Sequence, residues 1–268
     1  MSKLIDKLKG LNKTSLPTMG FRRPDREEKS LSMLVLAELP GKPEAEAKEI
    51  ADCGVAGAII DSAGLTSAAL SRYIKNTNGI VAGLAFTVNK AGNGYKLISD
   101  ELDFVVFNIN LPVTAFEGKE IENVGKILRV EASIDSSLLR SIRSVYPGID
   151  AVMIDMRVAT LTMEGLMNCR RVADFSGLPV MALVNKSLSK AELTAIRESG
   201  VKVLVLPQDA SVEEIKSLVD DIASLPRLEN RMEKKAVALL PKLGMFPTPK
   251  EESGDDEDGE DGDDDDDE

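Results

Sequence analysis

The chain has 268 residues, of which 43% are hydrophobic and 29% charged, and its formal net charge at pH 7 is −12. This length and composition are typical of a soluble globular protein with one large core. No apolar run reaches the roughly 18 residues that a membrane span requires, and the N-terminus lacks the apolar core of a signal peptide. We therefore predict a cytoplasmic protein whose two cysteines, Cys53 and Cys169, are reduced thiols.

The acidity is concentrated at the end of the chain. Residues 251–268 carry fourteen of the 45 acidic residues and no lysine or arginine, which leaves 33 basic and 31 acidic residues elsewhere. Such a segment repels itself and cannot bury apolar surface, so we predict a disordered tail. It would solubilise the protein, shield the basic segment before it, or bind a basic protein partner. The remainder has no basic stripe with interleaved aromatics, so nucleic-acid binding is not expected.

Short apolar runs alternate with helical patterns through the body of the chain. Strands are predicted at 31–39, 55–62, 80–87, 102–110, 126–135, 149–157, 178–186 and 201–207. Helices are predicted at 43–54, 66–79, 136–147, 162–177, 189–200 and 211–225, the last with Ser211 and Glu214 spaced as a capping box. Two connections fit a helix poorly: 90–101 is weakened by two glycines, and 111–125 has room for at most a short helix.

Eight strands that read as continuous Val/Ile/Leu runs are typical of a parallel sheet buried on both faces. Eight βα units are also the number that closes a TIM barrel, so we predict a (β/α)8 barrel over residues 31–225. An open doubly wound sheet is the alternative. Residues 226–250 are predicted to form a basic helix and a proline-rich linker. Residues 1–30 are an extension whose amphipathic start either packs on the barrel as a helix or anchors at a membrane surface, and the first is favoured.

The seventh and eighth units carry a resemblance to a known group of folds. The stretch GLPVMALVNKSLSKAELTAIRESGVKVLVLP resembles the corresponding units of phosphate-binding, aldolase-type TIM barrels. Those barrels place glycines after these two strands, where backbone N–H groups approach a phosphate. This chain has Asn185, Lys186 and Ser187 after the seventh strand, and Pro207, Gln208 and Asp209 after the eighth.

The carboxyl ends of the strands should form the active-site face of such a barrel. Three residues there are candidates for catalysis: Glu131 or Asp155 as the acid–base group, and Lys186 as an anion-binding residue or a Schiff-base nucleophile. Candidates for substrate binding are Asp61, Asn108, Arg129, Arg157 and Asn185. Arg129 and Glu131 lie two residues apart on one face of their strand. They face either the lumen of the barrel or the helices outside it, and the strand-end carboxylates could also serve only to cap helices or loops.

Four strand-end carboxylates could in principle hold Mg²⁺ through oxygen ligands alone: Glu38, Asp61, Glu131 and Asp155. The chain has no histidine, which excludes His-based acid–base catalysis and disfavours a zinc site.

The strand-end charges favour a lyase or isomerase that acts on a small anionic carbonyl compound at the barrel mouth. The alternative is a non-catalytic barrel that serves as a binding or scaffold protein through its termini. The missing glycines and histidine favour this alternative.

Overall fold

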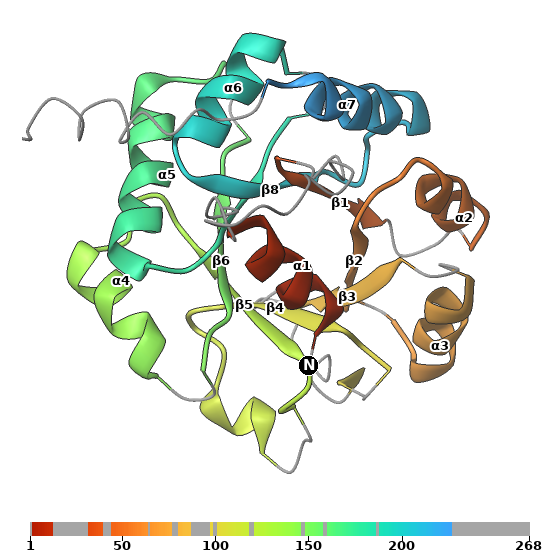
Figure 1. Ribbon diagram of the computed structural model, residues 1–268. Coiled ribbons are helices and arrows are strands. Elements are labelled where there is room, and N and C mark those ends of the chain that lie inside the picture. Colours follow the sequence, from red (N-terminus) through yellow and green to blue (C-terminus); the bar gives the residue numbers. More distant parts are fainter. Residues whose placement is uncertain are drawn as a thin grey trace, which may run out of the picture. The chain divides into compact units, whose positions relative to one another are not determined.

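Eight parallel strands close on themselves in the order β1 to β8 (Figure 1). The computed structural model describes residues 2–12, 32–39, 44–63, 65–76, 80–86, 97–98, 101–117, 121–145, 148–157, 160–185 and 188–226. The strands are β1 (Leu34–Leu39), β2 (Gly57–Asp61), β3 (Val81–Ala85), β4 (Phe104–Asn108), β5 (Gly125–Val130), β6 (Ala151–Asp155), β7 (Val180–Leu183) and β8 (Val201–Leu206). The predicted (β/α)8 barrel is confirmed, and the open doubly wound sheet is ruled out because β8 pairs with β1.

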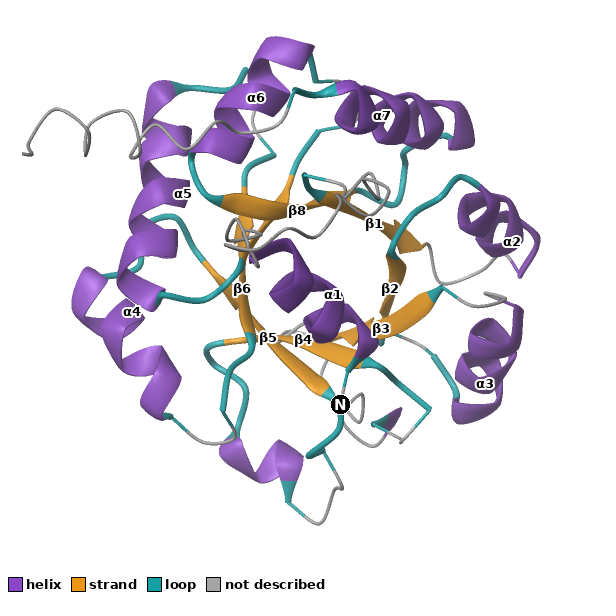
Figure 2. Ribbon diagram, in the orientation of Figure 1, coloured by secondary structure: helices purple, strands orange, loops and turns teal. Residues whose placement is uncertain are grey.

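Helices surround the ring of strands (Figure 2). They are α2 (Glu44–Asp52), α3 (Ser67–Asn76), α4 (Ser136–Ser141), α5 (Met163–Ser176), α6 (Lys190–Glu198) and α7 (Val212–Ser224), with short 3₁₀ turns η3 (Val113–Phe116) and η4 (Ile142–Ser144). The predicted capping box of α7 is confirmed: Ser211 and Glu214 bond each other's backbone N–H groups. The helix predicted at 136–147 is shorter because the chain becomes extended at Val145. Most of the poor helix predicted at 90–101 lies outside the described residues. The same holds for the basic helix and linker predicted at 226–250, of which only residue 226 is described, and for the acidic tail.

The core has two layers, one on each face of the barrel wall. Alternate strand residues point outward and pack against the helices, for example Val35, Ile60 and Val152. The residues between them point into the lumen and fill it, for example Leu36, Ile59 and Met153. The packing in the lumen is tight at Gly83 of β3, where a Cβ atom would lie 2.0 Å from the ring of Phe104 on β4.

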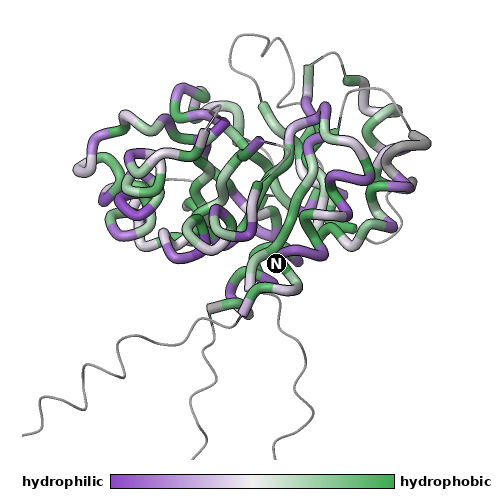
Figure 3. The backbone as a smooth tube through the Cα atoms, turned by 90° about the horizontal axis from the view of Figure 1, so that it is seen from above, coloured by the Kyte–Doolittle hydropathy of each residue, from purple (hydrophilic) through white to green (hydrophobic). Residues whose placement is uncertain are grey.

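A further helix, α1 (Lys3–Asn12), lies across one end of the barrel (Figures 1 and 3). Its side chains Leu4 and Leu8 are fully buried against the lumen cluster. Its first turn is held by Asp103, just before β4, which accepts hydrogen bonds from the backbone N–H groups of Lys3 at 2.6 Å and Leu4 at 3.0 Å. Lys7 donates a hydrogen bond to the carbonyl of Ala56, which is just before β2. Like the contact with Asp103, this bond lies at the N-terminal ends of the strands. The opposite end, where strands finish, is therefore not covered by α1. No helix in the part of the chain that the structure describes is long and apolar enough to span a membrane.

Candidate active site

Polar residues replace apolar ones at the last lumen-facing position of several strands. The lumen layer includes Leu36, Ile59, Val106, Ile127, Met153 and Leu183. Because side chains alternate along a strand, the residues two positions further on share the lumen face. Those residues are Glu38, Asp61, Asn108, Arg129, Asp155 and Asn185. Five of them were predicted as site residues, and together they form the polar rim of the barrel mouth.

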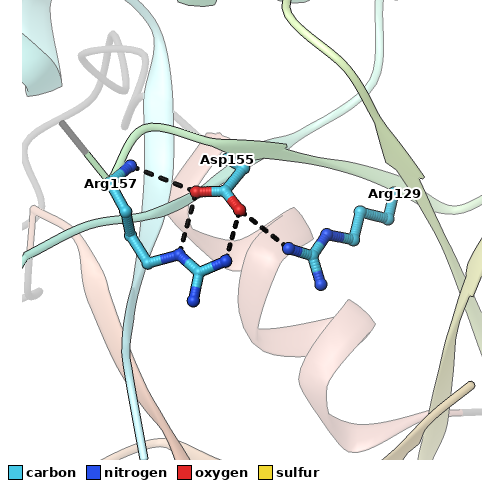
Figure 4. A network of polar contacts seen from close by, with 3 residues as sticks. All are labelled: Arg129, Asp155 and Arg157. Carbon is cyan, nitrogen blue, oxygen red and sulfur yellow. Dashed lines mark hydrogen bonds and ion pairs between the residues drawn. The ribbon is translucent and has the colours of Figure 1, made fainter. Parts of the chain in front are cut away.

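Asp155 is the centre of a charged network at this rim. Its Oδ2 atom lies 2.8 Å from Nη2 of Arg129 and 2.6 Å from Nη2 of Arg157. Its Oδ1 atom accepts from Nε of Arg157 at 3.0 Å and from the backbone N–H of the same residue at 3.1 Å. Figure 4 shows the carboxylate of Asp155 held between the two guanidinium groups. Arg129 therefore does not face outward toward a helix.

The surroundings of Asp155 keep it ionised. Burial opposes the charged form, but hydrogen bonds from the side chain and backbone of Arg157 and the charges of both arginines outweigh it, so the pKa of Asp155 falls below its usual value. The same contacts raise the pKa of Arg157. A carboxylate with a lowered pKa is a weak base, and Asp155 is better suited to orient the two guanidinium groups than to accept a proton.

Glu38 is the acid–base candidate that the sequence-based assignment of catalytic residues missed. It was predicted as a strand-end residue of the active-site face and as one of four carboxylates for Mg²⁺, but it was given no acid–base role, although it ends the lumen face of β1. Burial raises the pKa of Glu38, the positive charges of Arg129 and Arg157 partly offset this, and the negative charges of Asp155 and Asp61 add to it. The pattern LVLAEL, with a single charge in an apolar strand, was the signal available in the sequence.

The remaining predicted residues differ in their positions. Asp61 accepts a hydrogen bond from the backbone N–H of Ala63 at 3.0 Å. Asn108 accepts from the N–H of Asn110 at 3.4 Å. Both are half-buried, as is Asn185.

Glu131 is exposed just beyond β5, and its carboxylate accepts from the Ser133 hydroxyl at 3.4 Å. Lys186 lies outside the described residues.

A magnesium site built from the four carboxylates is not supported by the geometry. Within the described residues, no group of three or more His, Cys, Asp or Glu side chains is placed to hold a metal ion. Asp155 is engaged by two arginines, and Glu131 points to solvent.

Comparison with known proteins gives the type of fold. No protein-family model and no curated protein matches the chain. Among solved structures it is similar to the (S)-3-O-geranylgeranylglyceryl phosphate synthase of Thermoplasma acidophilum in complex with its substrate sn-glycerol-1-phosphate. The two chains are 14% identical, with a TM-score of 0.58, and the match covers 84% of this chain and 100% of that one.

Tryptophan synthase alpha-subunit from Pyrococcus furiosus is similar too, with 11% identity, a TM-score of 0.54, and coverage of 71% of this chain and 96% of that one. Tryptophan synthase from M. tuberculosis gives 12% identity, a TM-score of 0.54, and coverage of 72% and 92%. This chain has the fold of the aldolase-type TIM barrels. Identities this low show the fold alone. In enzymes of this architecture the active site lies at the carboxyl ends of the strands, which is where the Arg129–Asp155–Arg157 network lies.

Proposed function

We propose that this protein is a lyase or isomerase that binds a small anionic carbonyl compound at the mouth of the barrel. In this proposal Arg129 and Arg157 bind the carboxylate or phosphate of the substrate, Asp155 positions both arginines, and Glu38 transfers the proton. The observation that carries it is the convergence of two guanidinium groups on one carboxylate at the rim, with the half-buried Glu38 facing the same lumen.

The two arginines retain donors for a ligand. A guanidinium group has five N–H donors in a planar fork that matches a carboxylate or phosphate. Asp155 uses Nη2 of Arg129, and Nε and Nη2 of Arg157. Each guanidinium thus keeps N–H groups that no contact in the described part of the chain uses, and both remain partly exposed, at 36% and 40%. The Thermoplasma neighbour binds a small phosphate ester, which is consistent with an anionic ligand for this barrel.

Glu38 has the environment that proton transfer requires. An ordinary glutamate is too acidic to be an efficient base near neutral pH, and a raised pKa brings it closer to the optimum. The ionised Glu38 would take a proton from the carbon next to the substrate carbonyl, and the electron pair would move onto the carbonyl oxygen. An isomerase returns the proton to the neighbouring carbon. A lyase would instead use the enolate electron pair to form a C=C double bond to the next (β) carbon, which expels a leaving group from that carbon, and Glu38 would give its proton to the leaving group.

Solvent exchange tests this step without knowledge of the full reaction. Pyruvate, 2-oxobutyrate and dihydroxyacetone phosphate would be incubated with the protein in D₂O, and the loss of the proton signal next to the carbonyl would be followed by NMR. We expect the wild type to accelerate exchange of at least one probe. Glu38→Gln should lower the rate by roughly 100-fold or more, the scale of a general base. Arg157→Met should raise the KM by roughly 10- to 100-fold, the scale of a charge-assisted hydrogen bond.

Matched controls are available on the helices outside the barrel. Glu198 is exposed on α6, and Arg170 forms an exposed ion pair with Asp174 on α5. Glu198→Gln and Arg170→Met should leave exchange unchanged. If Glu38→Gln exchanges at the wild-type rate, the proton-transfer role of Glu38 is wrong. If no probe exchanges although anions bind, the non-catalytic binding protein becomes the better interpretation.

A further inference from the structure

The start of α7 already holds a carboxylate of this chain. Oε2 of Glu214 accepts the backbone N–H of Ser211 at 2.7 Å, and Oγ of Ser211 accepts the N–H of Glu214 at 3.3 Å. Just before it, the N–H of Ala210 donates to the carbonyl of Pro207 at 3.0 Å, and a proline has no N–H of its own. In barrels of this fold a phosphate is frequently bound here, by N–H groups of the loops after the seventh and eighth strands. An incoming phosphate would here meet a negative charge and N–H groups that are already used.

The start of α6, after the seventh strand, is built in the same way. Oε2 of Glu192 accepts the N–H of Ser189 at 2.8 Å, and Oγ of Ser189 accepts the N–H of Glu192 at 3.3 Å. The hydrogen bonds from the backbone and the hydroxyl of Ser189 lower the pKa of Glu192, so this carboxylate is ionised near neutral pH. Both helix N-termini at which this fold would receive a phosphate are therefore occupied by a glutamate.

The cations of the proposed anion site lie among further carboxylates. The pKa of Arg157 is raised mainly by its hydrogen bond to Asp155, and the negative charges of Asp155, Glu38 and Asp209 add to this. Asp209 follows the end of β8 and is exposed on the same rim of the barrel. A ligand bound to Arg157 therefore feels the repulsion of these carboxylates. The repulsion of a dianion is about twice that of a monoanion, because the interaction energy is proportional to the charge.

We propose that the anionic group of the substrate is a carboxylate and not a phosphate, and that Asp209 sets this preference. The substrate is then an unphosphorylated carbonyl acid, such as a 2-oxo acid. This class of substrate rests on the anion site of Arg129 and Arg157 proposed above. A carboxylate carries one negative charge, and its two oxygens match the planar fork of a guanidinium group, so it needs no cradle of backbone N–H groups.

A matched pair of probes tests the preference. Propionate and ethyl phosphate are of similar size and differ in the anionic group, and the phosphate is a dianion at pH 8. Both would be titrated into the full-length protein at pH 8 and constant ionic strength, with NMR as the readout. We expect propionate to bind at least about 10-fold more tightly than ethyl phosphate, which is about 1.4 kcal/mol.

Two variants separate the anion site from the residue that sets its preference. Arg157→Met should weaken the binding of propionate by about 10-fold or more. Asp209→Asn should narrow the preference for propionate by at least about 3-fold, because the loss of one negative charge helps a dianion more than a monoanion. Asp220→Asn, which removes an exposed carboxylate further along α7, is the matched control and should change the binding of neither probe.

The outcomes separate the choice of anion from the anion site itself. If ethyl phosphate binds as tightly as propionate and Arg157→Met weakens both, the preference for a carboxylate is wrong and the anion site stands. If ethyl phosphate binds tightly and Arg157→Met weakens propionate alone, phosphate has a site of its own, which also overturns the preference. If Asp209→Asn leaves the preference unchanged, the role of Asp209 is wrong. If neither probe binds, or if Arg157→Met leaves propionate binding unchanged, the anion site itself is wrong.

Discussion

Arg129 and Asp155 lie on the neighbouring strands β5 and β6, and their side chains meet at 2.8 Å although 26 residues separate them in the sequence. The register explains the contact: Arg129 is paired with Met153, so Asp155 is two residues further along β6 on the same face. An arginine is long enough to cover this diagonal. Arg157, which is two residues after Asp155 in the sequence, also donates to this carboxylate. Asp155 therefore orients both arginines of the site.

The first prediction concerns the pH dependence of this network. The pKa of Asp155 is lowered in the folded state, so its ionised form stabilises the protein above the unfolded pKa of about 3.9, and this stabilisation is lost as the pH falls through the folded pKa. Asp155→Asn should therefore lower the free energy of unfolding at pH 6–7, by no more than about 1 kcal/mol for each partly exposed ion pair. The difference from wild type should shrink at pH 3 and below, measured by urea unfolding. If the difference in unfolding free energy between Asp155→Asn and wild type stays constant from pH 7 to pH 2.5, the lowered pKa of Asp155 is wrong.

The second prediction concerns α1. Leu8 is fully buried against the lumen, so Leu8→Ala should lower the free energy of unfolding by about 2–4 kcal/mol, through lost burial and the cavity left behind. Lys9→Ala, on the exposed side of the same helix, is the matched control and should cost less than about 0.5 kcal/mol. Chemical denaturation measures both. Equal stability of Leu8→Ala and wild type would mean that α1 does not close the barrel in solution.

The third prediction concerns the packing of Gly83 against Phe104. An added Cβ at Gly83 would lie 2.0 Å from the Phe104 ring, so Gly83→Ala should destabilise the protein by about 1–3 kcal/mol through overpacking. A smaller side chain at position 104 makes room, so Gly83→Ala combined with Phe104→Leu should be more stable than the sum of the two single changes predicts. Gly10→Ala is the control, because a Cβ there meets no atom within 4 Å and the site is helical. It should stabilise by about 0.5–1 kcal/mol. If the change in unfolding free energy of the double variant equals the sum of the changes of the two single variants, the two residues do not compete for space.

The fourth prediction concerns the acidic tail and rests on its amino-acid composition alone. Deleting residues 251–268 removes fourteen carboxylates and almost no apolar surface. The melting temperature at moderate salt should therefore change by less than about 5 °C, which corresponds to roughly 1–2 kcal/mol for a domain of this size. A larger fall in a calorimetric scan would show that the tail docks on folded protein.

The sequence alone determined the number, order and parallel arrangement of the strands, because these follow from local patterns. Apolar runs of the right length predict buried strands, and the serine and glutamate of a capping box mark the start of α7. The position of residues at the carboxyl ends of the predicted strands also identified Asp61, Asn108, Arg129, Asp155 and Asn185 as candidates, since the active-site face of a barrel lies at that end. Their individual chemical roles were not determined in this way.

The tertiary structure decided which charges meet and therefore what each can do. Asp155 looked like a base in the sequence, but two guanidinium groups lower its pKa, and one of them comes from the preceding strand. Glu38 received little weight because its environment depends on burial and on Arg129, which is 91 residues away in sequence and across the barrel. The sequence also did not show which end of the barrel α1 covers. That depends on hydrogen bonds from the first turn of α1 to Asp103, which is about 100 residues away in the sequence. Electrostatic and packing effects depend on distance in space, which a local pattern does not contain.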